Sequence, residues 1–240
     1  MTRGILYIAS GSEFIREAVE SAKSVNQNTD LPTTIVCDRE ITDPCFDTVI
    51  QSEGFCYHYG DSVLQIPDLP YDKTLLLDTD TILSDKIDEV FEIADRFDIA
   101  AATIADGEFE LADKVPESFP EYNTGVILFK DNKKTREFIE EWKSVYRTYL
   151  DNGVRMNQPA FRETLYKSSL RIATLPTEYN CRANFGGYLN KKVKIMHGDF
   201  EDAEATMSQL NEYEVPRLFF NTDDGLQLQR IERINTRVFG

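Results

Sequence analysis

The sequence has few cysteines and lacks any apolar run long enough to cross a membrane. Its four cysteines include no Cys-x-x-Cys pair, which excludes the common zinc-knuckle and dithiol redox motifs. No apolar run approaches the roughly 18 residues that a membrane span needs, and the run near the N-terminus is too short for a signal-peptide core. We therefore expect a cytoplasmic protein with reduced, buried cysteines and no transmembrane segment, and peripheral attachment to a membrane stays open.

Positive charge is also scarce. The chain contains 26 Lys and Arg against 42 Asp and Glu, which gives a formal net charge of -16. This balance disfavours a nucleic acid or an anionic membrane as partner, because both require a concentrated positive surface. Hydrophobic residues make up 41% of the chain, enough for a proper core, and so disorder is excluded. The composition leaves open whether the acidity reflects a high-salt host or an ordinary soluble enzyme.

Short apolar segments alternate with amphipathic segments. The segments typical of buried strands are 4–10, 33–38, 73–81, 98–105 and 123–130, with a weaker one around 55–60. Helical spacing occurs over 12–25, 87–97 and 132–150. Buried strands separated by helices predict an α/β fold, with a mostly parallel central sheet and helices on both faces. No linker or repeat is visible, so we expect one domain.

The stretch "LLLDTDTIL", residues 75–83, interrupts an apolar strand with Asp78 and Asp80. Residues i and i+2 of a strand point to the same side, and ligands of open α/β sheets bind beyond the carboxyl ends of strands. Two carboxylates there suit Mg²⁺ or Mn²⁺. A calcium loop is disfavoured because it would continue with a third acid or Asn and then Gly, where Ile82 and Leu83 occur. Ile82 also fits a phosphatase motif poorly. Surface acids that cap the strand remain an alternative at this point.

Five segments, taken together and in order, resemble the GT-A-fold glycosyltransferases, particularly the glycogenin and galactosyltransferase-like family 8. They are "PYDKTLLLDTDTILSDKIDEVF", "YNTGVILFK", "NQPAF", "LPTEYNCR" and "KIMHGD". The resemblance covers about residues 4–200 and implies a GT-A-type nucleotide-diphospho-sugar transferase fold. It implies a nucleotide-binding half over about 1–105, a sugar and acceptor half over about 106–200, and a C-terminal extension over 200–240.

The resemblance implies that Asp78, Asp80 and His197 coordinate Mn²⁺, or Mg²⁺, between the two phosphates of a nucleotide-sugar, with a UDP-sugar favoured. A cation would relieve the repulsion between a diphosphate and so acidic a protein. Gly198, next to His197, would permit close approach of a phosphate. A histidine without this context is more often structural, which is how we interpret His58.

Further donor contacts follow from the same resemblance. Ala9 and Ser10 would lie at the base, Phe14 would stack on uracil, and Lys73 would reach the phosphates or the sugar. The remaining donor-binding positions are Thr79, Thr124 and Gly125. For Phe14 a role in the core, and for Lys73 a solvated position at the strand start, are equally good explanations.

Catalysis would fall to Asn123, Asn157 and Gln158, with Gln158 and Asn123 holding the sugar. Asn157 replaces the Asp usual in the family, which puts in doubt a negative charge beside the anomeric carbon. Transfer with retention needs no general base if the departing phosphate accepts the proton. An inverting enzyme would need a carboxylate base, for which the sequence offers Asp106, Glu108, Glu110 and Asp113.

Two other functions stay open. A nucleotidyltransferase that makes a nucleotide-sugar would require a glycine-rich, basic segment after the first strand, where only Gly11 and Arg16 occur. An inactive homologue that only binds a nucleotide-sugar is suggested by Asn157. The acceptor, which the sequence leaves unidentified among glycan, lipid and protein, and the oligomeric state are not predicted.

Overall fold

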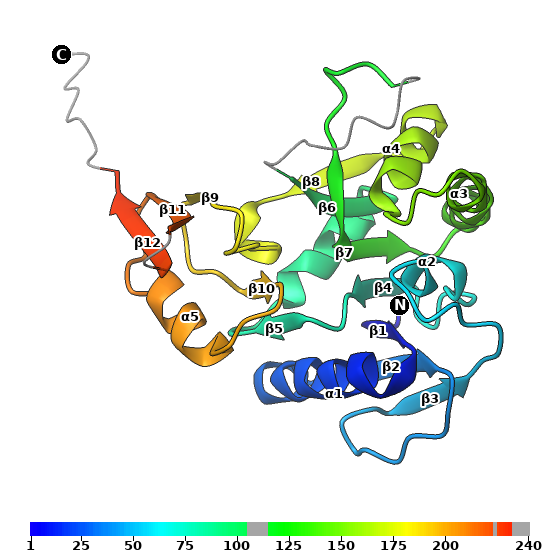
Figure 1. The fold of residues 1–240 in the computed structure, drawn as a ribbon, viewed down its shortest axis with the longest axis horizontal. Helices are drawn as coiled ribbons and strands as arrows, with labels where there is room; N and C mark the ends of the chain where they lie inside the picture. The colour runs from blue at the N-terminus through cyan, green and yellow to red at the C-terminus, as the bar shows by residue number, and fades with distance from the viewer. Residues whose placement is uncertain (105–114, 223–224, 232–240) are drawn as a thin grey trace.

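The centre of the computed structural model, which describes residues 1–104, 115–222 and 225–231, is a seven-stranded sheet. Its strands in spatial order are β3 (Thr48–Gln51), β2 (Thr33–Cys37), β1 (Arg3–Ala9), β4 (Lys73–Leu77), β7 (Tyr122–Lys130), β6 (Ile99–Thr103) and β8 (Ile172–Leu175). Only β7 runs antiparallel to its neighbours, and the other pairs are parallel. The predicted mostly parallel sheet is therefore confirmed (Figure 1).

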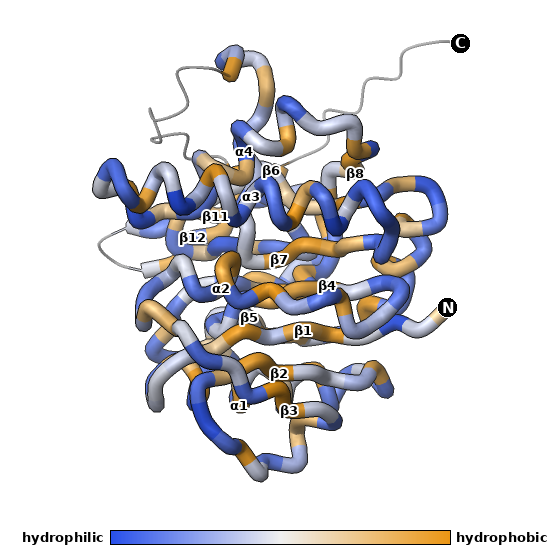
Figure 2. The backbone as a smooth tube through the Cα atoms, turned by 90° about the vertical axis from the view of Figure 1, so that its right-hand side faces the viewer, coloured by the Kyte–Doolittle hydropathy of each residue, from blue (hydrophilic) through white to orange (hydrophobic). Residues whose placement is uncertain are grey.

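Helices cover both faces of this sheet, as the sequence predicted. One face carries α1 (Gly11–Asn28) and the 3₁₀-helix η1 (Asp88–Asp95). The other carries α2 (Asp61–Leu64), α3 (Lys133–Asp151) and α4 (Gln158–Lys167). Figure 2 shows the hydrophobic residues, in orange, concentrated on β1, β4 and β7 between these layers. Among the described helices, none combines the length and the apolar character that crossing a bilayer requires.

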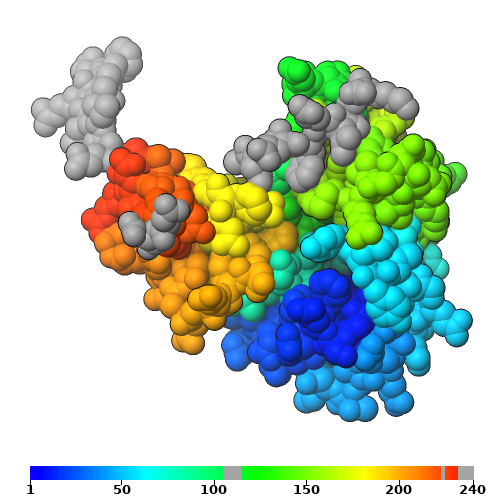
Figure 3. All heavy atoms as spheres, in the orientation of Figure 1, coloured from blue at the N-terminus to red at the C-terminus, as the bar shows by residue number. Residues whose placement is uncertain are grey.

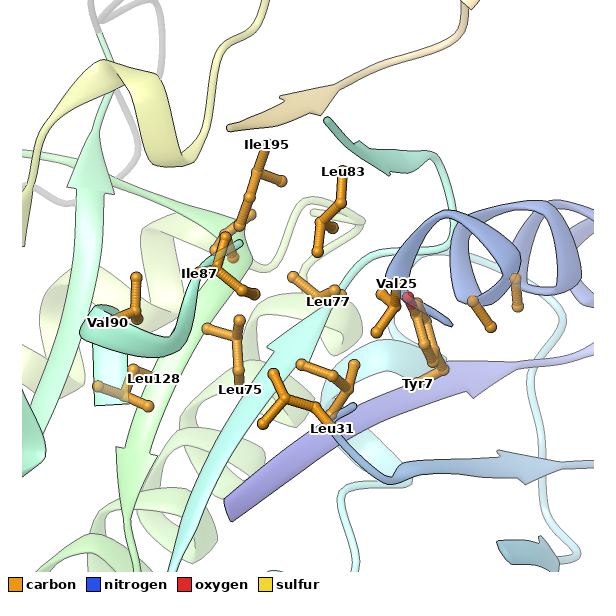
Figure 4. Close-up of a cluster of buried hydrophobic side chains, with 14 of the residues drawn as sticks. Tyr7, Val25, Leu31, Leu75, Leu77, Leu83, Ile87, Val90, Leu128 and Ile195 are labelled. Carbon is orange, nitrogen blue, oxygen red and sulfur yellow. The ribbon is translucent and has the colours of Figure 1, made fainter. Parts of the chain in front are cut away.

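Strand alternation explains why two apolar layers form. Ile5 and Tyr7 of β1 point toward α1, whereas Leu6 between them packs on the opposite side. In β4, Leu75 and Leu77 join the layer of Tyr7, which Figure 4 shows in close-up. Burying one such leucine contributes about 2 kcal/mol, so these strands stabilise the centre of the fold.

A smaller region follows at the C-terminal side. Strand β10 (Ile195–His197) pairs antiparallel with β5 (Thr81–Leu83), just beyond β4. The short 3₁₀-helix η2 (Thr177–Tyr179) precedes β9 (Gly187–Leu189), which forms a separate antiparallel sheet with β11 (Arg217–Thr222) and β12 (Gly225–Arg230). Helix α5 (Ala203–Leu210) packs under that sheet, around a core of its own. Figure 1 shows this region in yellow to red.

Three expectations from the sequence are wrong in detail. Residues 55–60 form a turn rather than a strand, because the buried carboxylate of Asp61 accepts the backbone N–H groups of Cys56 and Tyr57 at 2.7 Å each. The edge strand of that region lies earlier, at β3. Segment 88–95 is a 3₁₀-helix, and over eight residues the 3₁₀ and α periods are too similar to separate by pattern. Cys56 is exposed, whereas the other cysteines are buried.

Candidate functional site

A pocket of about 420 Å³ opens where β1 and β4 end and β7 begins. Its walls come from the segments 8–17, 58–62, 78–80, 123–124, 156–158 and 182–199. Figure 3 shows the surface hollowed between the yellow-to-red C-terminal region and the green and blue remainder. This is the carboxyl edge of the parallel strands, where open α/β sheets bind ligands.

Asp78 and Asp80 lie in the turn directly after β4, rather than on the strand itself. The backbone N–H of Asp78 donates to the carbonyl of Gly125 at 2.8 Å, and Thr81 Oγ1 donates to the Asp78 carbonyl at 2.8 Å. The Asp80 carbonyl accepts the backbone N–H of Gly198 at 3.0 Å. Both carboxylates are half-buried and face the pocket, and these bonds hold their backbone in place.

His197 reaches the two carboxylates through the pairing of β10 with β5. Its Nε2 lies 3.3 Å from Asp80 Oδ1 and 3.6 Å from Asp78 Oδ2. One ligand atom from each of the three residues lies within 4.8 Å of the others. The structure therefore brings the three predicted metal ligands together, although more than a hundred residues separate His197 from the two acids in the sequence.

A chain of amides orients the His197 ring. Asn123 Oδ1 accepts both the backbone N–H of Gly125, at 2.9 Å, and Nδ2 of Asn180, at 2.8 Å. The oxygen of Asn180 then faces His197 Nδ1 at 2.9 Å, so this nitrogen donates and carries the proton. His197 Nε2 is left facing the two carboxylates, so loss of its proton would present a lone pair there, which is the arrangement of a metal-binding histidine.

Gly125 gives an independent test of whether this group fits a cation. A Cβ added at Gly125 would lie 2.1 Å from His197 Cε1, so only glycine lets the imidazole sit over β7. Two carboxylates and one imidazole nitrogen are a donor set that Mn²⁺ and Mg²⁺ accept. The residues present therefore fit a divalent cation.

The electrostatics of the group are those of crowded negative charge. Burial raises the pKa of Asp78 to about 7, with a further contribution from the charge of Asp80 and opposition from His197. Burial also opposes ionisation of Asp80, but the hydrogen bond with His197 and its charge outweigh burial and lower the Asp80 pKa. For His197, burial lowers the pKa, and the two carboxylates outweigh it and raise it. A divalent cation would replace shared protons as the balancing charge.

A polar wall faces this group across the pocket. Asn157, nearly buried, accepts from Thr124 Oγ1 at 2.7 Å and donates to Ser62 Oγ at 3.2 Å. Gln158 is 5% exposed and lines the pocket, and its buried Nε2 has no hydrogen-bond partner among the described residues. A buried amide donor without a partner costs free energy, which a ligand oxygen in the pocket would recover.

The first strand and helix supply a third part of the wall. Ser10 Oγ donates to Asp61 Oδ2 at 2.8 Å, and Thr79 Oγ1 donates to Glu17 Oε2 at 2.7 Å. Phe14 both lines the pocket and packs against the core on the α1 side, so its two proposed roles are compatible. Ala9 is buried beneath this wall at the end of β1.

Four predicted site residues, Ala9, Gly125, Gly198 and Lys73, do not line the pocket. Gly125 and Gly198 contact His197 and Asp80, whereas Lys73 lies elsewhere. It lies at the start of β4, at the opposite end of the strand from Asp78, and its ammonium donates to Asp95 Oδ1 at 2.6 Å. The expected contact with the donor is therefore not supported. The acids considered as an inverting base, Asp106, Glu108, Glu110 and Asp113, lie outside the described residues.

Sequence reasoning missed several residues that line the pocket: Glu17, Tyr59, Asp61, Ser62, Met156, Arg182 and Asp199. Three had a signal. Glu17 follows Phe14 by three residues, so it shares a helix face with it. Arg182 and Asp199 are the last residues of the quoted segments "LPTEYNCR" and "KIMHGD". His58, predicted to be structural, accepts the Gly60 N–H at 2.9 Å and also lines the pocket.

A family model described as nucleotide-diphospho-sugar transferase matches residues 66–210, more than half of the chain. No protein of curated function matches the sequence significantly. Several solved structures are similar in fold. The glycosyltransferase GlyE of Streptococcus pneumoniae TIGR4 aligns over 90% of this chain at 16% identity, with a TM-score of 0.61. The chain spans 58% of the length of GlyE.

Two other structures align over most of both chains. The galactosyltransferase LgtC, solved with donor and acceptor sugar analogs, aligns over 86% of this chain and 94% of its own, at 12% identity and a TM-score of 0.59. Mouse xyloside xylosyltransferase 1 aligns over 83% of this chain and 98% of its own, at 17% identity and a TM-score of 0.52. Similarity at identities this low establishes a common fold, and it does not transfer the substrates of these proteins to this chain.

Proposed function

The chain belongs to the nucleotide-diphospho-sugar transferase family, and on this premise we propose that it is a divalent-metal-dependent glycosyltransferase. It moves a sugar from a nucleotide-diphosphate sugar, with UDP-sugars favoured, to an acceptor. Its fold is the GT-A fold that the sequence predicted, shared with LgtC and GlyE. Transfer with retention of anomeric configuration is part of the proposal.

The observation that carries the proposal is the convergence of Asp78, Asp80 and His197 on one pocket, with Gly125 making room for the imidazole. These three residues would hold Mn²⁺ or Mg²⁺. A cation bound there would neutralise the diphosphate and stabilise it as a leaving group. The amides of Asn180 and Asn123 contribute by keeping Nε2 of His197 directed at the site.

Arg182 supplies the permanent positive charge of the described pocket wall, which otherwise contains several carboxylates. Its guanidinium lies 3.8 Å from the ring centroid of Phe185, a cation–π contact that limits the rotamers of a long side chain. The residue before Arg182, Cys181, pairs with β10, because its N–H donates to the Ile195 carbonyl and its carbonyl accepts the His197 N–H. Arg182 is therefore well placed to bind phosphate oxygens of the donor.

The sugar is assigned to the polar wall. Gln158 Nε2 offers a buried donor to a sugar hydroxyl, and Asn123 lines the same part of the pocket. In the described part of this wall, residues 123–124 and 156–158 contain amides and a hydroxyl but no carboxylate. This composition favours retention, in which the departing phosphate oxygen accepts the proton of the acceptor hydroxyl.

The alternative that a specific residue favours is a sugar-nucleotide-binding protein without transferase activity. Asn157 lies where relatives of this kind usually have Asp, and its amide is already engaged with Thr124 and Ser62. We also propose a cytoplasmic location, supported by free cysteines at Cys37, Cys45, Cys56 and Cys181, with peripheral attachment to a membrane as the other possibility.

Calorimetric titration with a panel of nucleotide-sugars, in Mn²⁺, in Mg²⁺ and in EDTA, tests the proposal, with donor hydrolysis followed in parallel. We expect a UDP-sugar to bind with metal and to lose at least about 100-fold in affinity in EDTA or in Asp80→Ala. Asp95→Ala, an exposed acid on the far side of β4, is the matched control and should bind normally. Absence of any nucleotide-sugar binding, or unchanged binding in the Asp78→Ala/Asp80→Ala double variant, would refute the metal site.

A further inference from the structure

The small three-stranded sheet has an exposed face that its own core does not explain. Along β11, Phe219 points into the core with Leu189 and Leu228, and the alternate residues point outward. We call this outward side the outer face. Its side chains are those of Tyr188, Leu218, Phe220, Thr222, Gln227 and Gln229. Tyr188, Leu218 and Phe220 are 47%, 39% and 40% exposed, which places two aromatic rings and a leucine at the surface.

The outer face carries no charged side chain along the described strands β9, β11 and β12, in a chain of net charge -16. The two arginines of these strands are elsewhere. Arg217 is fully buried, and Arg230, its cross-strand partner, stacks on Tyr213 at 3.4 Å. A partner recognised by charge, such as an anionic lipid surface or a basic protein, has nothing to bind on the outer face.

Carboxamides stand beside the apolar side chains. Gln227 lies opposite Phe220 and Gln229 lies opposite Leu218 in the β11–β12 ladder, so each pair projects on the same side. Aromatic rings pack against the C–H faces of sugar rings, and carboxamides both donate to and accept from hydroxyls. This combination of groups complements an uncharged carbohydrate better than a wholly apolar surface would.

The outer face is linked to the pocket by the chain segment that precedes β9. A Cβ added at Gly186 would lie 3.4 Å from the Cα of Phe220, so Gly186 is adjacent to that residue. Phe185 comes next in the chain and is half exposed, with the Arg182 guanidinium over its ring. Arg182 lines the pocket. The segment from Arg182 to Tyr188 therefore leads from the pocket, past Phe185 and Gly186, to the outer face.

We propose that the outer face binds the acceptor, and that this acceptor is an uncharged oligosaccharide whose terminal sugar enters the pocket. The inner sugars of the chain lie on Tyr188 and Phe220, with hydroxyls bonded to Gln227 and Gln229. This inference rests on the proposed transferase function and names the substrate class of that site. Because contacts extend beyond one ring, affinity should rise with the length of the oligosaccharide.

The experiment titrates the full chain with malto-, cello- and chito-oligosaccharide series, from disaccharides to hexasaccharides, with UDP and Mn²⁺ present. We expect at least one series to bind, with longer members tighter by about tenfold, and the Tyr188→Ala/Phe220→Ala variant to lose that gain. Phe97→Ala, an aromatic residue of similar exposure, 38%, is the matched control. UDP binding without oligosaccharide should be equal in all three proteins.

Each contrary result has a distinct meaning. If no neutral oligosaccharide binds while UDP and Mn²⁺ do, the acceptor proposal is overturned and the donor site stands. If UDP does not bind either, the proposed function itself has failed, and the acceptor proposal with it. Two other occupants of the outer face are a second copy of the chain and a neutral lipid surface. Sedimentation of the wild type and the double variant tests the first, and flotation with neutral phosphatidylcholine vesicles tests the second. If the double variant loses self-association or vesicle binding but keeps its oligosaccharide binding, the outer face binds that other partner instead.

Discussion

The seven-stranded sheet buries mainly apolar side chains between its helices, whereas the three-stranded sheet includes a fully buried arginine. Leu75, Leu76 and Leu77 of β4 are at most 2% exposed and need no polar partner. Arg217 of β11 is 0% exposed, and its guanidinium donates to the backbone carbonyls of Leu210, at 2.9 Å, and Lys191, at 3.0 Å. A small region with little apolar area to bury gains order instead from charge-assisted hydrogen bonds that tie its loops together.

The difference has a consequence for the site, because each region supplies part of it. Asp78 and Asp80 follow the apolar strand β4, while Arg182 lies between β8 and β9 and His197 is the last residue of β10. The carboxylates are therefore fixed by the large core, and the imidazole depends on the docking of β10 against β5. Variants that loosen only the smaller region should weaken the site without unfolding the larger one.

The largest effect is expected for Arg217→Leu. The change leaves three backbone carbonyls, those of Leu210, Val215 and Lys191, without their donor, and we expect a loss of about 3 kcal/mol in stability. Hydrogen exchange measured by mass spectrometry should increase in β9 and β11 and change little in β1 and β4. Arg230→Leu, in which only an exposed ring contact is lost, should cost about 1 kcal/mol or less.

Uniform acceleration of exchange in both sheets of the Arg217→Leu variant would contradict this contrast. It would mean that the two regions unfold as one cooperative unit. Equal losses of stability in Arg217→Leu and Arg230→Leu would contradict the role assigned to the buried guanidinium.

A smaller effect is expected for Asn180→Ala, which acts where the two regions meet. The change removes the acceptor for His197 Nδ1 and should weaken Mn²⁺ binding by about 10-fold to 100-fold, since the ring loses its fixed orientation. Titration of Mn²⁺ followed by electron paramagnetic resonance measures this directly. Asn190→Ala, at an exposed position of the same segment, is the control. Equal Mn²⁺ affinity in the two variants would show that Asn180 does not position His197.

The same contrast explains how far the sequence predicted the fold. Strands such as β1 and β4 are buried on both faces, so their apolar runs stand out from the polar segments around them. Strands β9 and β10 have only three residues each, and most residues of β11 and β12 are exposed, so their pattern is weak. The turn at 55–60 depends on the single buried carboxylate of Asp61, a tertiary contact that no local pattern reveals.

The sequence predicted those residues of the candidate site that lie in motifs occurring in the same order as in the family. Asp78, Asp80 and His197 were predicted because the surrounding segments occur in a familiar order, and the structure brings them together. Glu17 reaches the pocket because of its position on α1, and Arg182 because the residue before it pairs with β10. These positions depend on the folded structure, so the sequence motifs alone did not identify the two residues as site residues. Lys73 shows the converse, because it was predicted from the resemblance and lies at the opposite end of β4 from Asp78.

The smallest effect is expected for Asp98→Asn, in the large sheet. Asp98 is 4% exposed and accepts from the Arg171 backbone N–H at 3.0 Å, from its guanidinium at 3.2 Å, and from Asn132 Nδ2 at 3.2 Å. Burial opposes ionisation of Asp98, but the hydrogen bonds and charge of Arg171 outweigh it and lower the pKa. The ionised form therefore stabilises the fold at pH values above the unfolded-state pKa, near 4, by about 1 kcal/mol with an exposed partner.

Urea unfolding of the wild type and Asp98→Asn, from pH 7 downward, tests this contribution. The difference in stability should be constant above about pH 5 and shrink as the pH falls through the lowered pKa of folded Asp98, because the wild-type carboxylate is then protonated. Asp88→Asn, which breaks the exposed pair with Arg3, should change stability by about 0.5 kcal/mol or less. A difference for Asp98→Asn that is the same at pH 7 and pH 3 would mean that hydrogen-bond geometry, and not the charge of the carboxylate, stabilises this end of the large sheet.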